Sequence, residues 1–320
     1  MSINNKQSLI IISGPTAAGK TALSIELAKN INGSIISADS MQVYKGMDIG
    51  SAKISTDEMQ GIKHYLIDIL DPKEDFNIAL FKEYAKNAIE SINAADKIPI
   101  VVGGTGFYIQ ALLYDIDFNE SASEDSTIRD ELTLLVKEKG NEYVHDMLKI
   151  VDIKSANDIH PNNIKRVIRA IEYYKLTGKK ISDHNEEQHQ KESPYNFKYF
   201  VINEDRQTLY NNIDRRVDIM VENGLVEEVK RLKASGLNRD YISMQGLGYK
   251  EILAYLDDEI SIEEAIDIIK RDTRHFAKRQ LTWFRREKEV TWINKEDFEY
   301  NNEKILKYIK EQLKSEGIIQ

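Results

Sequence analysis

The sequence predicts an α/β protein in which helices cover a parallel sheet, with an all-helical insertion. Short apolar segments alternate with helical patterns from residue 9 to about 114 and again after residue 198. Between these parts, residues 115–197 show mainly helical patterns. Strands that alternate with helices form parallel sheets buried on both faces. A glycine-rich loop after the first strand makes the predicted sheet P-loop NTPase-like, with a core of 1–114 and 198–320 and an insertion of 115–197.

The elements of the core are predicted by apolar runs and by their boundaries. Each predicted strand is a short β-rich run, several of them closed by glycine, proline or aspartate. These strands are 9–12, 34–38, 64–69, 98–102, 198–202 and 290–293. Apolar residues at helical spacing predict helices at 21–30, 76–92, 207–233 and 262–287. In the last helix, Ile269, Phe276 and Trp283 recur every seven residues and predict an apolar stripe.

The insertion is predicted to contain helices and a polar connection. Helical patterns cover 126–139, 141–149 and 164–176. The polar stretch 182–194 is typical of a linker that leads back to the core.

Composition excludes several classes of protein. The chain has 320 residues, a net charge of -9 and no cysteine, so disulfides, cysteine zinc sites and thiol catalysis are excluded. No apolar run approaches the ~20 residues that span a bilayer, and the polar first residues do not resemble a signal peptide. We therefore expect a cytoplasmic protein without a membrane partner.

The strongest motif is a phosphate loop. It consists of Gly14, Pro15, Thr16, Ala17, Ala18, Gly19, Lys20 and Thr21, between a buried strand and a helix. The glycines let backbone N–H groups turn toward phosphate oxygens, Lys20 adds a positive charge, and Thr21 offers a hydroxyl to Mg²⁺. The motif predicts a bound di- or triphosphate and leaves the reaction open.

Two further loops follow strands that end at the same edge of the sheet. Asp39 follows the second strand, where it could bind a metal, act as a general base, or cap the next turn. Three glycines, Gly103, Gly104 and Gly106, surround Thr105 after the fourth strand and allow close approach to the backbone. Ligands of such sheets bind beyond the carboxyl ends of the strands.

Two basic segments point to a polyanionic partner. Lys165, Arg166 and Arg169 follow His160-Pro161 on a predicted helix. Residues 270–288 carry eight Lys or Arg against two acids, which is the charge pattern of phosphate-backbone binding. A solvated helix face is the alternative for both segments.

Together these motifs resemble the tRNA dimethylallyltransferases, also called tRNA isopentenyltransferases. The resemblance rests on GPTAAGKT at 14–21, DSMQVYKG at 39–46, GGTGFY at 103–108, HPNNIKRVIRA at 160–170, GLGYKE at 246–251 and TRHFAKRQLTWFR at 273–285. It implies transfer of a dimethylallyl group from dimethylallyl diphosphate to N6 of adenosine 37 in tRNAs that read codons beginning with U. The absence of cysteine in the chain favours the short bacterial form, and the family suggests a monomer.

The resemblance also implies roles for residues. Asp39 and Thr105 would be catalytic, and Arg216 would bind the diphosphate, with Arg215 as the other possible register. ATP binding would be expected only because the phosphate-loop motif is present, since the reaction itself does not need ATP. Candidates for contact with the tRNA anticodon stem-loop are Asp39, Ser40, Met41, Gln42, Thr105, Arg129, Lys165, Arg166, Val167, Ile168, Arg169, Gly248, Tyr249, Lys250, Arg274, Lys278 and Arg279. The helical insertion would hold the stem-loop.

Two other functions remain possible from the residues alone. A P-loop small-molecule kinase would use Lys20 and Thr21 with ATP, and Asp39 would deprotonate a hydroxyl. A non-enzymatic RNA-binding module would not need Lys20 and Thr21 beside Asp39. The basic segment 270–288 argues against the kinase, because a small acceptor does not need it.

Overall fold

A computed structural model describes residues 6–116 and 127–319 of the chain. It divides into two compact units, one formed by Met1–Leu112 with Pro194–Gln320 and the other by Leu113–Ser193. The predicted division fell at 114/115 and 197/198, within a few residues of these boundaries. Within the described residues, no helix is both long and apolar enough to cross a bilayer.

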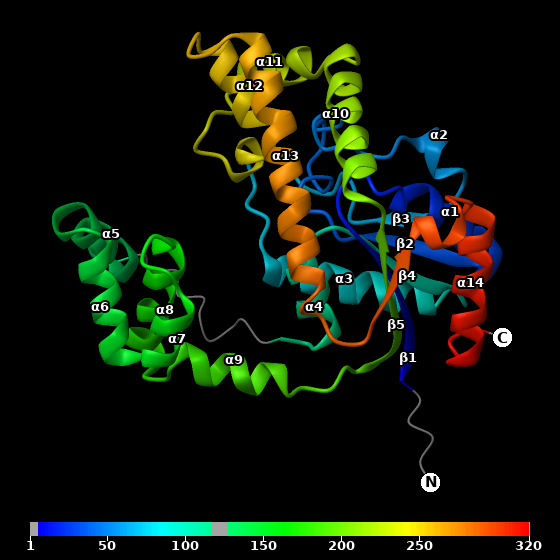
Figure 1. The fold of residues 1–320 in the computed structure, drawn as a ribbon, viewed down its shortest axis with the longest axis horizontal. Coiled ribbons are helices and arrows are strands. Elements are labelled where there is room, and N and C mark those ends of the chain that lie inside the picture. Colours follow the sequence, from blue (N-terminus) through cyan, green and yellow to red (C-terminus); the bar gives the residue numbers. More distant parts are fainter. Residues whose placement is uncertain (1–5, 117–126, 320) are drawn as a thin grey trace. The chain divides into compact units, whose positions relative to one another are not determined.

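The first unit contains a six-stranded parallel sheet with the order β3-β2-β4-β1-β5-β6 (Figure 1). Its strands are β1 (Gln7–Ser13), β2 (Gly33–Ser37), β3 (His64–Tyr65), β4 (Ile98–Gly103), β5 (Tyr195–Asn203) and β6 (Val290–Asn294). The central strand β1 pairs with β4 on one side and with β5 on the other. The phosphate loop therefore leaves the middle of the sheet.

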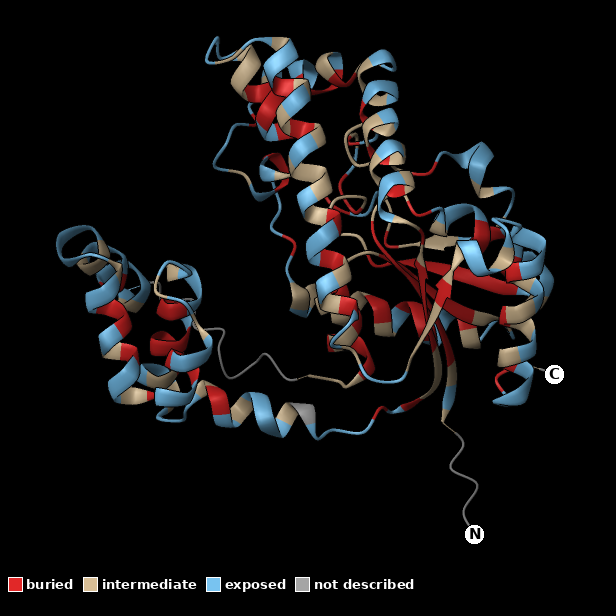
Figure 2. Ribbon diagram, viewed as in Figure 1, coloured by how far each residue is buried: buried red, intermediate tan, exposed pale blue. Residues whose placement is uncertain are grey.

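Helices cover both faces of the sheet, and β1, β2 and β4 at its centre are mostly buried, whereas the edge strands β3 and β6 are mostly half-buried (Figure 2). The helices of this unit are α1 (Lys20–Ile31), α2 (Thr56–Met59), α3 (Ile78–Asn93), α4 (Gly106–Leu113), α10 (Arg206–Glu222), α11 (Leu225–Ala234), α12 (Tyr249–Leu256), α13 (Ile262–Phe284) and α14 (Asn302–Ser315), with short 3₁₀ turns at Ile242–Gln245 and Lys295–Phe298. Ile10 and Ile12 of β1 share a core cluster with residues of α1 and α14. Leu9 and Ile11 alternate with them and are also fully buried.

Among its described residues, the second unit contains helices and connecting loops but no strand. It consists of α5 (Thr127–Lys139), α6 (Asn141–Val151), α7 (Ile153–Asp158), α8 (Ile164–Thr177) and α9 (Ile181–His189). Leu132, Val144, Leu148 and Val167 belong to its own core cluster. Residue 126, the first of the predicted helix 126–139, lies outside the described residues.

The predicted linker 182–194 is wrong in its first half, because α9 occupies Ile181–His189. The carboxylate of Asp152, which is almost fully buried, accepts hydrogen bonds from the backbone N–H and the hydroxyl of Ser182. These bonds fix the start of a helix whose polar composition gives no periodic signal.

Three other predictions need correction. The predicted helix 207–233 is broken between Glu222 and Leu225, where Gly224 has a φ of 97°. The third strand ends at Tyr65, because Leu66 and Asp68 adopt positive φ values of 63° and 53°. On the last long helix, the buried residues are Ala265, Ile269, Ala277, Gln280 and Phe284, whereas the predicted stripe partners Phe276 and Trp283 are only half-buried.

A buried carboxylate joins α11 to the loop that follows β2. Glu228 accepts hydrogen bonds from the backbone N–H groups of Asp48 at 2.9 Å and Gly50 at 3.0 Å, and it also accepts the N–H of Ile49. The hydroxyl of Tyr249 donates to the same carboxylate at 2.9 Å. The four donors satisfy the buried carboxylate, and its removal would leave three backbone N–H groups and one hydroxyl without this acceptor.

We expect Glu228→Gln to lower the free energy of unfolding by about 2–4 kcal/mol, because its amide group would face N–H donors without accepting from all of them. Urea unfolding followed by circular dichroism measures the loss. Glu227→Gln, at the exposed neighbouring position, is the matched control and should stay within about 0.5 kcal/mol of the parent. An equal stability of both variants would show that the Glu228 contacts contribute nothing.

Candidate active site at the carboxyl edge of the sheet

The phosphate loop connects β1 to α1 in a conformation that depends on glycine. Gly14 has a φ of 145°, and a Cβ atom there would lie 2.3 Å from the carbonyl oxygen of Ile202. Gly19 caps α1 in the left-handed region, and no side chain caps the helix. The first N–H groups of α1 therefore have no acceptor within the helix and form an anion-binding site.

Two cations from different helices reach this loop. The ammonium group of Lys20 donates to the carbonyl oxygens of Gly14 at 2.9 Å and Pro15 at 2.7 Å. The guanidinium of Arg216, on α10, donates to the hydroxyl of Thr16 at 3.3 Å. Arg215 is exposed. Of the two candidate registers, Arg216 is therefore the arginine at the loop.

The charges at the loop perturb one another. Burial, and to a lesser extent the positive charge of Arg216, lower the pKa of Lys20 to about 7, although the carboxylate of Asp39 opposes both effects. Burial also lowers the pKa of Arg216, and Asp39 opposes this. The site without an anion is thus short of negative charge, which a bound diphosphate would supply.

Asp39 follows β2 and reaches the same group of charges. One carboxylate oxygen, Oδ1, accepts the backbone N–H groups of Met41 at 2.8 Å and Gln42 at 3.4 Å, so the residue does cap the next turn. In the described part of the chain no hydrogen bond is recorded for its other oxygen. Burial raises the pKa of the Asp39 carboxyl, although the two N–H groups, Lys20 and Arg216 oppose the rise. A carboxylate with a raised pKa is a better proton acceptor near neutral pH.

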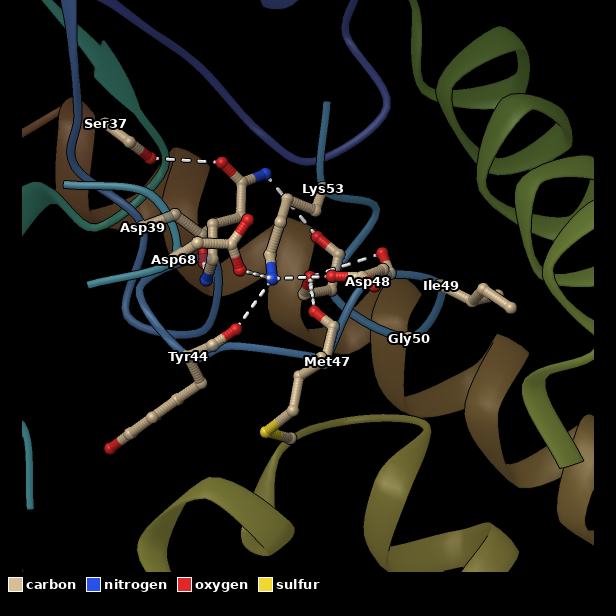
Figure 3. A network of polar contacts seen from close by, with 12 residues as sticks. Ser37, Asp39, Tyr44, Met47, Asp48, Ile49, Gly50, Lys53 and Asp68 are labelled. Atoms are coloured by element: carbon tan, nitrogen blue, oxygen red, sulfur yellow. Dashed lines mark hydrogen bonds and ion pairs between the residues drawn. The ribbon is translucent and has the colours of Figure 1, made fainter. Parts of the chain in front are cut away.

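The loop that carries Asp39 is held by its own polar contacts (Figure 3). The ammonium group of Lys53 is almost fully buried and donates to the carbonyl oxygen of Tyr44 and to the carboxylates of Asp48 and Asp68, at 2.5–2.7 Å. The side chain of Gln42 accepts from Ser37 and donates back to the same loop. Gln42, predicted to hold a tRNA base, therefore binds its own loop in this structure.

The glycine-rich loop after β4 lies between the other two. A Cβ atom at Gly103 would lie 2.2 Å from the carbonyl oxygen of Ala38, and the hydroxyl of Ser13 donates to the carbonyl oxygen of Gly103 at 2.7 Å. Thr105 follows directly, and its carbonyl oxygen accepts the N–H of Tyr108 at the start of α4. The loops after β1, β2 and β4 thus meet at one edge, as predicted.

Two side chains of α13 contact these loops; the sequence pattern assigned Trp283 to an apolar stripe and gave Gln280 no role. The side-chain oxygen of Gln280 accepts the backbone N–H of Thr16 at 2.9 Å, and its amide nitrogen donates to the carbonyl oxygen of Gly104 at 2.9 Å. Trp283 covers Gly106, where a Cβ atom would lie 2.2 Å from its ring. A polar residue within a buried helical stripe is the signal that could have singled out Gln280.

A third cation near the loop was also missed. The ammonium group of Lys295 lies 3.1 Å from the position that a Cβ atom of Gly19 would occupy. The buried carboxylate of Glu204 pairs with Lys295 at 3.4 Å. Lys295 follows β6, whose pairing with β5 brings it to this edge; nothing local in the sequence marks it.

The basic strip on α13 is less free than its sequence indicates. Arg274 pairs with Asp214 and Lys270 pairs with Asp218, both at 2.5 Å. The sequence predicts that too few acids are present to balance the basic residues of 270–288. This expectation is wrong for Arg274 and Lys270, because α10 supplies an acidic partner for each. For the exposed Lys278 and Arg279, the described residues record no ion pair.

Several predicted tRNA contacts have buried side chains. Val167 and Ile168 lie in the core of the second unit, and Tyr249 is fully buried against Glu228. These three side chains are therefore removed from the predicted contact set. Gly248 caps α12 with a φ of 93°, and Lys250 is exposed beside Glu251.

The remaining predicted contacts lie on exposed surfaces or beside the site. In the second unit, Lys165, Arg166 and Arg169 are exposed on α8, and Arg129 pairs with Glu172 at 2.8 Å. Ser40 is half-buried beside Asp39, and the Met41 side chain lies against Gly246.

The residues present fit a magnesium ion of the kind that phosphate loops bind. Thr21 is exposed in the first turn of α1, and the structure records no hydrogen bond for its hydroxyl among the described residues. Mg²⁺ commonly takes one or two protein ligands and completes its shell with phosphate oxygens and water. The described residues contain no cluster of three metal-binding side chains that would hold an ion alone.

We expect the affinity for inorganic diphosphate to fall as the pH rises above about 7, the pKa of Lys20 in the free protein. The anion favours the charged form, so binding takes up a proton above this pH and weakens by up to about tenfold per pH unit. Calorimetric titrations from pH 6 to pH 9 measure this, with Lys20→Arg as the control that stays charged. If the affinity depends on pH equally in both proteins, the titration of Lys20 is not the cause.

Comparison with known proteins agrees with this geometry. The model of the family described as IPP transferase matches residues 42–287. A tRNA dimethylallyltransferase from Lachnoclostridium phytofermentans is 61% identical over 292 residues, which are 91% of this chain and 93% of the relative. One from Acetivibrio thermocellus is 53% identical, covering 97% of this chain and 98% of the relative.

Solved structures give the same result. The full-length tRNA isopentenylpyrophosphate transferase from Bacillus halodurans has a TM-score of 0.73 and 45% identity, with 98% of both chains covered. A eukaryotic dimethylallyltransferase that acts on tRNA has a TM-score of 0.77 and 31% identity, covering 90% of this chain and 74% of its own. The chain belongs to the IPP transferase family, the tRNA dimethylallyltransferases, in its bacterial form.

Proposed function

We propose that the protein transfers a dimethylallyl group from dimethylallyl diphosphate to N6 of adenosine 37 in tRNAs that read codons beginning with U. The observation that carries the proposal is the meeting of the phosphate loop, which Lys20 and Arg216 contact, with the turn of Asp39 at one edge of the sheet. It joins a group that can accept a proton to cations that can stabilise a departing diphosphate. The relatives are named for this transfer and support it over the kinase alternative.

The reaction exchanges a carbon–oxygen bond for a carbon–nitrogen bond. The bond between the allylic carbon and the diphosphate breaks, and the electron pair leaves with the diphosphate. The N–H groups of the phosphate loop, Lys20 and Arg216 stabilise the charge that develops there. Mg²⁺, held by Thr21 and by phosphate oxygens, would supply further charge stabilisation.

The acceptor nitrogen must lose a proton when the new bond forms. The free oxygen of Asp39 takes it, while the other oxygen stays bound to the turn that fixes the carboxylate. Thr105, on the neighbouring loop, is proposed to contact the adenine. The base reaches this site only after it leaves the stack of the anticodon loop.

The exposed basic residues on α8 and α13 are proposed to bind the tRNA backbone. The candidates on these helices are Lys165, Arg166, Arg169, Lys278 and Arg279, because they are exposed. A monomeric, cytoplasmic enzyme is part of this proposal. ATP would compete for the phosphate loop without being consumed.

The function is tested by incubating the protein with undermodified tRNA, dimethylallyl diphosphate and Mg²⁺, without ATP. We expect one diphosphate released for each modified adenosine, with the nucleoside identified by its mass. A requirement for ATP, or transfer of labelled γ-phosphate to an acceptor, would favour the kinase and overturn the proposal.

We expect Asp39→Asn to lower the single-turnover rate by about 10²–10⁴-fold, because the amide oxygen still caps the turn but the proton acceptor is lost. Binding of tRNA and diphosphate should change little. Asp39→Ala removes both functions and shows how much the cap adds. A rate above half of the parent value in Asp39→Asn would remove this carboxylate from the chemistry.

We expect Lys278→Ala to reduce the magnitude of the salt slope of tRNA binding by roughly 0.7–0.9, as the loss of one phosphate contact does. Arg274→Ala should have a smaller effect, since Arg274 is already paired with Asp214. Affinities measured between low and moderate salt give both slopes. If neither slope changes, the strip on α13 is a solvated face.

A further inference from the structure

Gln280 has an unusual position for an amide side chain. It lies on the buried face of α13 with only 6% of its surface exposed. Both of its polar atoms are used, one for the N–H of Thr16 in the phosphate loop and one for the carbonyl oxygen of Gly104, each at 2.9 Å. A single side chain therefore connects the loop after β1 to the loop after β4.

The surroundings of Gln280 leave little freedom. A Cβ atom at Gly104 would lie 2.1 Å from its amide nitrogen. Thr16 is held on its other side by Arg216, which donates to its hydroxyl. One turn farther along α13, Trp283 closes over Gly106 and packs against the ring of Phe107 at 5.8 Å between centroids.

We infer that Gln280 is a positioning residue for the transfer reaction, because it sets the separation between the phosphate loop and the loop that carries Thr105. The inference rests on the proposed function. The allylic carbon is attached to the diphosphate held by one loop, and the attacking nitrogen lies on the side of Thr105 and Asp39. Small errors in the distance between the two reactants cost large factors in rate.

The inference predicts a split between binding and chemistry. Gln280→Met keeps the length of the side chain and removes both hydrogen bonds. We expect the single-turnover rate to fall about 10–100-fold, with the affinities for tRNA and for inorganic diphosphate within threefold of the parent. Gln207→Met is the control, because Gln207 is exposed on α10 and, among the residues that the structure describes, its side chain bonds only Asn211.

A double-mutant cycle tests the contact itself. Gly104→Ala should lower the rate at least tenfold in the parent protein, since its methyl group displaces the Gln280 amide. In a Gln280→Ala background the space is free, so Gly104→Ala should cost less than threefold further. This non-additivity is the signature of two groups that act through one contact.

The possible outcomes separate the inference from the function. If the parent protein transfers the dimethylallyl group and Gln280→Met stays within twofold of its rate, the positioning role is wrong. A loss of tRNA affinity as large as the loss of rate would also overturn it, and would make Gln280 a tRNA contact. If the parent protein itself does not transfer the group, the proposed function fails. The non-additivity of Gly104→Ala and Gln280→Ala, measured in thermal unfolding, still tests whether the two residues touch.

Discussion

The candidate site depends on backbones that meet where no Cβ atom fits. At Gly14 such an atom would lie 2.3 Å from the carbonyl oxygen of Ile202, and at Gly103 it would lie 2.2 Å from that of Ala38. These contacts let the loops after β1, β2 and β4 leave the sheet side by side. Lys20, Asp39 and Thr105 lie at the same edge because the backbone segments that carry them lie close together there. A side chain at Gly14 would push the phosphate loop away from β5, and one at Gly103 would push the loop after β4 away from the end of β2.

The charges at this edge of the sheet favour the binding of an anionic ligand. Lys20 and Arg216 reach the phosphate loop from two helices, and Lys295 approaches Gly19 from beyond β6. Burial lowers the pKa of both Lys20 and Arg216, and Asp39 compensates only in part. A diphosphate would offset this excess of positive charge and would raise the pKa of Lys20. Burial raises the pKa of Asp39, so the same environment favours charge loss on both the cation and the acid.

What could be predicted from the sequence was local in the chain. The phosphate loop and the motifs around Asp39 and Thr105 are short segments whose backbone geometry restricts their residues, and the structure brings them to one edge. Helix α9 and the break at Gly224 could not be predicted from periodicity, because a buried Asp152 and a single left-handed residue determine them. Gln280 bonds Thr16, which lies 264 residues earlier in the chain, and Arg274 forms an ion pair with Asp214 on another helix. Apart from the polar position of Gln280 within a buried helical stripe, spacing and composition do not reveal which residues make these contacts.

A phosphate loop alone does not distinguish a reaction in which diphosphate is the leaving group from one in which a phosphoryl group is transferred. Lys20 and Thr21 can stabilise the developing charge in either reaction. Helix α13 provides the distinction. Its buried face holds the phosphate loop and the loop of Thr105 through Gln280 and Trp283. Its exposed face carries Lys278 and Arg279, for which the described residues record no acidic partner. A small acceptor would gain nothing from that second face, whereas a tRNA bound to it would be anchored to the same helix that fixes the reacting loops. The proposed tRNA contacts on α13 would thus link binding of a large polyanion to the position of the leaving group, which a transferase acting on tRNA requires.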